Sequence, residues 1–166
     1  MQFDASGSYD PFDLPITYHW DFGDGEESES INPTHTFTAP TADPTPYTVT
    51  LTVTDSLGVS ASTSTIISLN NTPPEVNITS VEDGSLYTLT GYTWLPLEAE
   101  VNDTEHDRED LGYAWDVFFH HNEHYHAEPT DPNPSTHVLI DPAGCELELY
   151  WYRIRLTVTD GAGLQG

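Results

Sequence analysis

Two twelve-residue segments that lie far apart in this chain nearly repeat each other. They read YTVTLTVTDSLG at 47–58 and YRIRLTVTDGAG at 152–163. In both, apolar and polar residues alternate strictly, so that Val49, Leu51 and Val53 share one face. Alternation with period two, rich in β-branched residues, is typical of a strand buried on one face. The TD-x-x-G ending supplies turn residues. The repeat therefore predicts antiparallel β-structure.

Two further pairs of segments support the repeat. ITYHWDF at 16–22 resembles LGYAWDV at 111–117, and NPTHTF at 32–37 more weakly resembles NPSTHV at 133–138. All three pairs occur in the same order, which indicates an internal duplication. Helical periodicity is absent, and thirteen prolines and eleven glycines separate short alternating runs. This pattern is typical of an all-β sandwich.

The stretch LNNTPPEV at 69–76 predicts a domain boundary. Adjacent prolines cannot join a central strand ladder and favour a stiff, extended linker. We therefore expect a first domain over 1–70, a proline-rich linker over 71–74 and a second domain over 75–166.

The first domain resembles the polycystic kidney disease (PKD) domain, an immunoglobulin-like sandwich common in secreted bacterial and archaeal proteins. FDASGSYDP, YHWDFGDG, NPTHTF and YTVTLTVTDSLG carry the resemblance. The family's usual first strand is missing. The second domain resembles a divergent copy that keeps YAWDV and LTVTDGAG, lacks the GDG turn and stops before its last strand is complete. The predicted fold is all-β, with two immunoglobulin-like (PKD-type) antiparallel β-sandwiches in tandem.

This resemblance implies a non-catalytic module of a larger secreted or surface protein. PKD domains typically space, present or help to bind polymeric substrates for attached enzymes, and some bind calcium. The expected partners are a polysaccharide or cell-surface polymer, together with enzyme or surface domains in the same chain. Adhesion or protein–protein interaction is the alternative. No GxSxG elbow, HExxH motif or glycine-rich phosphate loop is present, so no enzymatic activity is expected.

The charge restricts the partners further. The chain has 28 acidic residues against three basic ones, which gives a net charge of −25. Nucleic acids and anionic membranes would be repelled. No apolar run approaches the ~18 residues that span a bilayer, so no membrane insertion is expected. The lone Cys145 cannot form an intrachain disulfide and is expected to be a small core residue.

The segment HHNEHYH at 120–126 contains four of the chain's eight histidines. It belongs to an insertion, 118–132, that stands where the first domain has the short turn at 23–25. If the strand continues past Val117, His124 and His126 point the same way. Imidazoles at this spacing suit Zn²⁺ or Cu²⁺. The candidate ligands are His120, His121, His124, His126 and His137. A structural cluster of histidines and aromatic rings is the alternative.

Similar HHN-x-H-x-H segments followed by an LTVTD strand occur in PKD-like tails of secreted sugar dehydrogenases of the glucose/sorbosone type. The resemblance implies a parent protein that acts on carbohydrates. Exposed aromatic side chains that stack on sugars fit this expectation, and the candidates are Trp94 and Trp151. Alternation places Trp151 opposite the core set of its strand, beside Arg153 and Arg155, where it either binds a ligand or packs under the histidine insertion.

Acidic clusters precede both Trp-containing strands. Ca²⁺ takes six to eight oxygen ligands from flexible loops, and these clusters offer carboxylates. The resemblance to calcium-binding PKD domains points to Asp10, with Asp103 and Asp107 as its positional equivalents. The calcium candidates are Asp10, Asp103, Glu105, Asp107 and Asp116. The alternative is that these acids form turns or are simply solvated.

Overall fold

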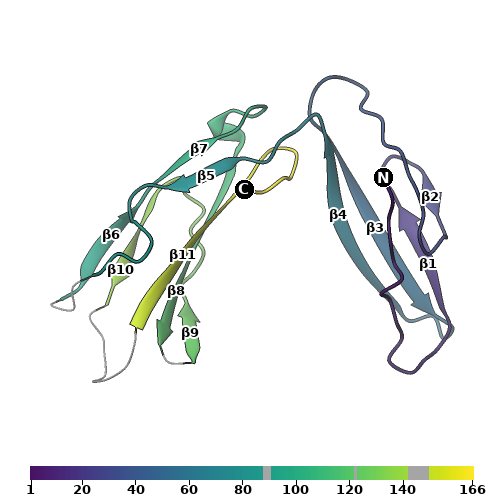
Figure 1. The fold of residues 1–166 in the computed structure, drawn as a ribbon, viewed down its shortest axis with the longest axis horizontal. Helices are drawn as coiled ribbons and strands as arrows, with labels where there is room; N and C mark the ends of the chain where they lie inside the picture. The colour runs from purple at the N-terminus through teal and green to yellow at the C-terminus, as the bar shows by residue number, and fades with distance from the viewer. Residues whose placement is uncertain (88–90, 122, 142–149) are drawn as a thin grey trace. The chain divides into compact units, whose positions relative to one another are not determined.

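The computed structural model describes residues 1–87, 91–121, 123–141 and 150–166 (Figure 1). The chain divides into two compact units, Met1–Asn71 and Thr72–Gly166. The prediction of an all-β fold is confirmed, because the regular structure of the described residues consists almost wholly of strands. Each pair of these strands is antiparallel, as predicted. The described residues contain a single short 3-10 helix, η1 (Arg108–Asp110). None of their helices is long and apolar enough to cross a membrane.

The first unit contains one four-stranded sheet in the order β2-β1-β3-β4. Its strands are β1 (Ile16–Asp21), β2 (Glu27–Ser28), β3 (Thr45–Asp55) and β4 (Ser60–Leu69). The alternation along β3 has the expected effect, because Val49 and Leu51 are buried while Thr52 and Thr54 bond to serines of β4 on the opposite face. The sheet thus turns one apolar face inward.

Two irregular segments cover this inner face. Residues 1–5 run antiparallel to residues 31–35, with a bridge between Gln2 and Thr34. Phe3 packs against Trp20 at 5.4 Å between ring centroids. Ala5, Trp20, Phe22, Val49 and Leu51 form the buried core of this unit.

Gly23 lies in the tight turn between β1 and β2. Its φ is +77°, and a Cβ there would lie 2.6 Å from the backbone oxygen of Thr48. Gly25 has a φ of +92° and open space around it.

Gly23→Ala is expected to lower the free energy of unfolding by more than backbone strain alone would. A non-glycine residue in the left-handed region costs about 1–3 kcal/mol, and at Gly23 the clash with Thr48 adds to that cost. Gly25→Ala tests strain alone. Equal decreases in the free energy of unfolding of the two variants, measured by urea denaturation, would contradict a clash between the added Cβ and the backbone oxygen of Thr48.

The second unit contains three small sheets. Their orders are β11-β8-β9, β10-β6 and β5-β7. The strands are β5 (Glu75–Ile78), β6 (Thr93–Leu97), β7 (Ala99–Asn102), β8 (Gly112–His121), β9 (His124–Ala127), β10 (Thr136–Ile140) and β11 (Tyr150–Thr159). Side chains from all three sheets meet in one core around Trp115, which is 1% exposed.

The repeated segments occupy equal places in the two units. Trp20 in β1 is the Cα partner of Leu51 in β3, and Trp115 in β8 is the partner of Leu156 in β11. Each tryptophan is buried. Asp55 and Asp160, which end the second strand of each pair, accept hydrogen bonds from the amides two and four residues later. The repeat in the sequence is therefore also a repeat of strand register and turn geometry.

Candidate metal centre and aromatic platform

The histidine-rich segment forms a β-hairpin. β8 ends at His121, β9 begins at His124, and these two residues are Cα partners. Much of the predicted insertion 118–132 is thus an extension of the sheet. On one continuous strand from Val117 to His126, alternation predicts that His120 shares a face with His124 and His126 and that His121 lies opposite; this prediction is wrong. It assumed one continuous strand, whereas the chain reverses after His121 and side-chain parity is reset.

Three histidines on one face of this hairpin form the candidate metal centre, which we call the histidine triad: His121, His124 and His126. Each offers a ring nitrogen, and the three nitrogens lie within 4.8 Å of one another. The Nε2 atoms of His121 and His126 are 3.1 Å apart. The rings of His121 and His124 lie edge to face at 3.9 Å.

The triad has the chemistry of an open transition-metal site. Zn–N bonds of about 2.0–2.1 Å at tetrahedral angles separate two ligand nitrogens by about 3.3 Å. His124 and His126 are exposed and His121 is half-buried, so solvent or a ligand can reach a bound ion. His137 is not part of this group; it is exposed on β10, where its Cα partner is Pro96.

The opposite face of the same hairpin carries an aromatic platform, defined as Phe118, His120, Tyr125 and Trp151. His120 stacks on Trp151 at 3.8 Å with an interplanar angle of 10°. Tyr125 meets Phe118 edge to face at 5.4 Å. Trp151 is 48% exposed and Tyr125 is 54% exposed. Trp151 therefore packs against the hairpin and still presents part of its indole to solvent.

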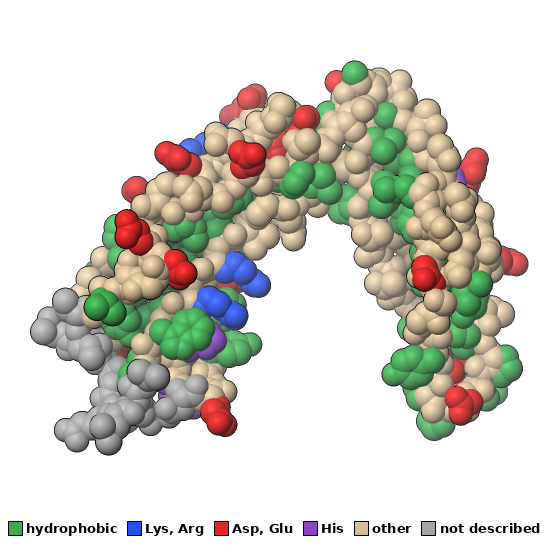
Figure 2. All heavy atoms as spheres, viewed as in Figure 1, with side chains coloured by type: hydrophobic (Ala, Val, Ile, Leu, Met, Phe, Trp, Pro, Cys, Tyr) green, Lys and Arg blue, Asp and Glu red, His purple; other side chains and the backbone are tan. Residues whose placement is uncertain are grey.

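Two of the chain's three arginines lie against this platform. The guanidinium of Arg153 sits 4.5 Å from the ring centroid of Phe118. Arg155 bonds to Asp116 at 2.7 Å. Figure 2 shows basic, aromatic and histidine side chains gathered on one face of the second unit. In a chain of net charge −25, this face concentrates the positive charge.

Local partners shift two ionisation equilibria on this face. A hydrogen bond from Thr130 and then the guanidinium of Arg155 hold the pKa of Asp116 below its ordinary value. Desolvation, followed by the positive charge of Arg153, lowers the pKa of His120. His120 therefore stays neutral to lower pH than a free histidine, which suits a ring stacked on Trp151.

The calcium candidates of the second unit do not converge. Asp116 is held by Arg155 and Thr130 on the platform face. Glu105 accepts hydrogen bonds from the amide and hydroxyl of Thr72, at 3.0 and 2.8 Å. Asp107 is exposed at the start of η1. Among the described residues, only Asp103 of these four joins a group of potential ligands, and its neighbours there are His106 and Asp160.

The sequence reasoning missed His106. It stands three residues after Asp103, in the acidic loop that was considered only for calcium. Asp160, 54 residues further along, was interpreted as a turn former, which it is. Trp94 is 66% exposed on β6, away from the hairpin in the strand pairing. Cys145 lies outside the described residues.

Comparison with known families assigns the first unit. Residues 1–68 match the family model described as PKD domain. The first unit is therefore similar to a PKD domain, and we call it the PKD-like domain. PKD domains are non-catalytic modules that typically occur in extracellular or surface proteins. The matched residues contain β1, β2, β3 and most of β4, the strands that form its sheet.

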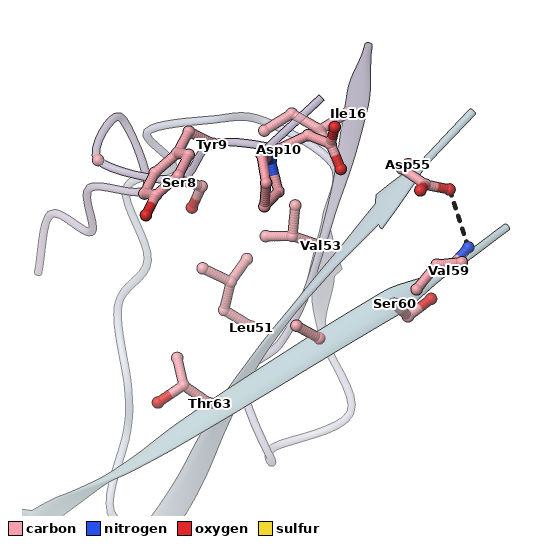
Figure 3. Close-up of a pocket in the computed structure, with 13 residues that line it drawn as sticks. Ser8, Tyr9, Asp10, Ile16, Leu51, Val53, Asp55, Val59, Ser60 and Thr63 are labelled. Atoms are coloured by element: carbon pink, nitrogen blue, oxygen red, sulfur yellow. Dashed lines mark hydrogen bonds between the residues drawn. The ribbon is translucent and has the colours of Figure 1, made fainter. Parts of the chain in front are cut away.

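The PKD-like domain has an open hollow of about 420 Å³ beside β3 and β4 (Figure 3). Its floor includes Leu51 and Val53, and its rim includes Tyr9 and Asp10. One carboxylate oxygen of Asp10 accepts the amides of Phe12 and Leu14, at 2.8 and 3.1 Å. Within the described residues Asp10 joins no group of three potential ligands. Its bonds are those of a turn-forming aspartate.

Proposed function

We propose that the chain is a non-catalytic accessory module of an extracellular or surface protein, and that it binds Zn²⁺ or Cu²⁺ through the histidine triad. The second unit is proposed to be a diverged copy of the PKD-like domain, on the basis of equal strand register. The observation that carries the metal proposal is the approach of three imidazole nitrogens to within 4.8 Å of one another on one exposed hairpin face.

The geometry favours a metal over a purely structural cluster. The contact between His121 and His126 involves one ring nitrogen of each, and His124 offers a third nitrogen within 4.8 Å of those that the other two offer. Neutral imidazoles present lone pairs that Zn²⁺ and Cu²⁺ accept. The hairpin fixes the strand register and brings the three residues together before an ion binds, which reduces the entropic cost of assembling the site.

Metal titration tests this proposal. Untagged protein is stripped with a chelator and titrated with ZnCl₂ or CuSO₄ in a calorimeter. Replacing all three triad histidines by alanine is expected to remove one equivalent of bound metal relative to the wild type. His120→Ala is the matched control, because His120 lies on the same hairpin but on the opposite face. Unchanged stoichiometry in the triple variant, or no binding tighter than about micromolar by the wild type, would rule the triad out.

The aromatic platform supports a second candidate function, binding of a carbohydrate polymer. Exposed aromatic faces stack on the apolar faces of sugar rings, and Trp151 and Tyr125 are each about half exposed on the platform. The adjacent Arg153 supplies hydrogen-bond donors and positive charge.

Retention on insoluble polysaccharides tests the platform. Trp151→Ala is expected to reduce retention by at least about 5-fold, since one stacking contact is worth about 1–3 kcal/mol by analogy with base stacking. Trp94→Ala is the matched control, because Trp94 is similarly exposed but lies on β6. Equal loss in both variants, or no retention of the wild type on any polymer, would leave the platform without this role.

A further inference from the structure

A second group of potential ligands lies in the second unit, away from the hairpin sequence. Asp103 follows β7, His106 lies in the acidic loop before η1, and Asp160 follows β11. Each offers one ligand atom, and these atoms lie within 4.8 Å of one another. We call this group the Asp-His-Asp cluster. It does not depend on the histidine triad or on the proposed function.

Asp103 brings a buried, incompletely bonded carboxylate to the cluster. Its side chain is 0% exposed. One carboxylate oxygen, Oδ1, accepts the backbone amides of Glu105 and His106 at 2.9 and 2.7 Å. The other, Oδ2, is buried without a hydrogen-bond partner in the described structure. A buried oxygen without a partner lowers stability, and a charged one lowers it more. Oδ2 of Asp103 is therefore suited to bind a cation.

The imidazole of His106 is held beside both carboxylates. Its Nδ1 lies 3.1 Å from Asp103 Oδ1, and its side chain is 13% exposed. A Cβ on Gly161 would lie 3.0 Å from His106 Cδ2 and 3.2 Å from Nε2. The ring thus packs directly on the backbone next to Asp160, and glycine is the residue that leaves room for it.

The carboxylate of Asp160 is also held in place by its surroundings. It is 5% exposed, and its Oδ1 accepts the amides of Ala162 and Leu164, both at 2.9 Å. In the PKD-like domain Asp55 makes the same two bonds with Leu57 and Val59. The residues that follow Asp10 there are Pro11, Phe12 and Asp13, so no imidazole is supplied. The cluster is a feature of the second unit.

We infer that Asp103, His106 and Asp160 bind a divalent transition metal of the Zn²⁺ or Mn²⁺ class. Two carboxylates and one imidazole form a mixed oxygen and nitrogen donor set. Calcium takes oxygen ligands, whereas imidazole suits transition metals. Two buried carboxylates also leave a negative charge that a divalent cation neutralises. Water completes the coordination, since three protein ligands leave open positions.

The test uses the full-length chain with all three triad histidines replaced by alanine, which removes the hairpin site. Titration with ZnCl₂ is expected to show one remaining equivalent. His106→Gln in this background is expected to weaken zinc binding by at least about 100-fold, since even residues that only support a ligand are worth about 10- to 100-fold. Asp107→Asn, which removes an exposed carboxylate next to the loop, is the matched control and is expected to change nothing.

A second measurement keeps the inference testable if His106→Gln does not fold. Co²⁺ added to the triad-substituted chain is expected to shift the ring proton resonances of His106 strongly, because a paramagnetic ion shifts the resonances of the residues that coordinate it. Unshifted His106 resonances would overturn the inference. So would binding of zinc that is unaffected by His106→Gln, or equal affinity for Ca²⁺ and Zn²⁺.

Discussion

Zinc at a hundred times its dissociation constant is expected to stabilise the second unit against unfolding by about 2.7 kcal/mol through the histidine triad. The proposed site is assembled only in the folded hairpin, so an ion bound there would raise the free energy of unfolding. His124→Ala is expected to remove this stabilisation, because two imidazoles remain and the weakened site is no longer saturated. The measurement is urea denaturation with and without zinc, followed by NMR signals of β8 and β11.

The zinc experiment needs a background in which the triad acts alone. His106→Gln removes the imidazole of the Asp-His-Asp cluster and leaves the hairpin untouched. In that background His120→Ala is expected to keep the zinc-dependent stabilisation, since His120 points to the aromatic platform. Equal stabilisation of the His124→Ala and His120→Ala chains would mean that zinc acts elsewhere. Equal effects of zinc and of sodium at matched ionic strength would mean that zinc only screens the net charge of −25.

Trp115→Ala is expected to lower the free energy of unfolding of the second unit by about 3–5 kcal/mol. Trp115 is 1% exposed and lies in the core to which all three sheets contribute. The substitution removes a large apolar surface and leaves a cavity between the sheets. Domains of this size have unfolding free energies of about 5–15 kcal/mol, so the loss is a large part of the total. Urea denaturation followed by NMR signals from the second unit measures it.

Trp94→Ala is the control for this loss. Trp94 is 66% exposed, so its removal is expected to change the free energy of unfolding by less than about 0.5 kcal/mol. The first unit has its own core around Trp20, and its transition is expected to be unaffected by Trp115→Ala. Similar losses from Trp94→Ala and Trp115→Ala would contradict the core described for the second unit.

The strands and their buried faces could be predicted from sequence because both depend on local alternation. Trp20 and Leu51 are buried in the first unit, and their counterparts Trp115 and Leu156 are buried in the second. Parity within a strand is fixed by backbone geometry, so it does not require knowledge of distant residues.

The faces of the histidine hairpin could not be predicted in the same way. Alternation predicts which face a side chain occupies within one strand, but not across a turn. Because the chain reverses after His121, His120 lies on the opposite face from His124 and His126. Asp116 shows a related limit. The sequence makes Asp116 a calcium candidate, whereas the strand register pairs it with Arg155, whose guanidinium holds its carboxylate.

The Asp-His-Asp cluster could not be predicted from the sequence, because one of its members lies far from the other two in the chain. Asp103 and His106 are neighbours in one loop, whereas Asp160 is 54 residues beyond His106. Their approach depends on how β7 and β11 pack within the second unit, and no local pattern encodes that distance. The internal repeat gave one usable signal, since the acidic loop and the strand-ending aspartate occur in both units, but only the second loop contains a histidine.

X-ray absorption at the zinc edge tests the triad most directly. The sample is the full chain carrying His106→Gln, loaded with one equivalent of zinc and freed of excess ion. Three imidazole nitrogens are expected at about 2.0–2.1 Å, with the outer-shell scattering of the rings. A shell made of oxygens alone, or zinc that is lost on buffer exchange, would contradict a metal centre built from His121, His124 and His126.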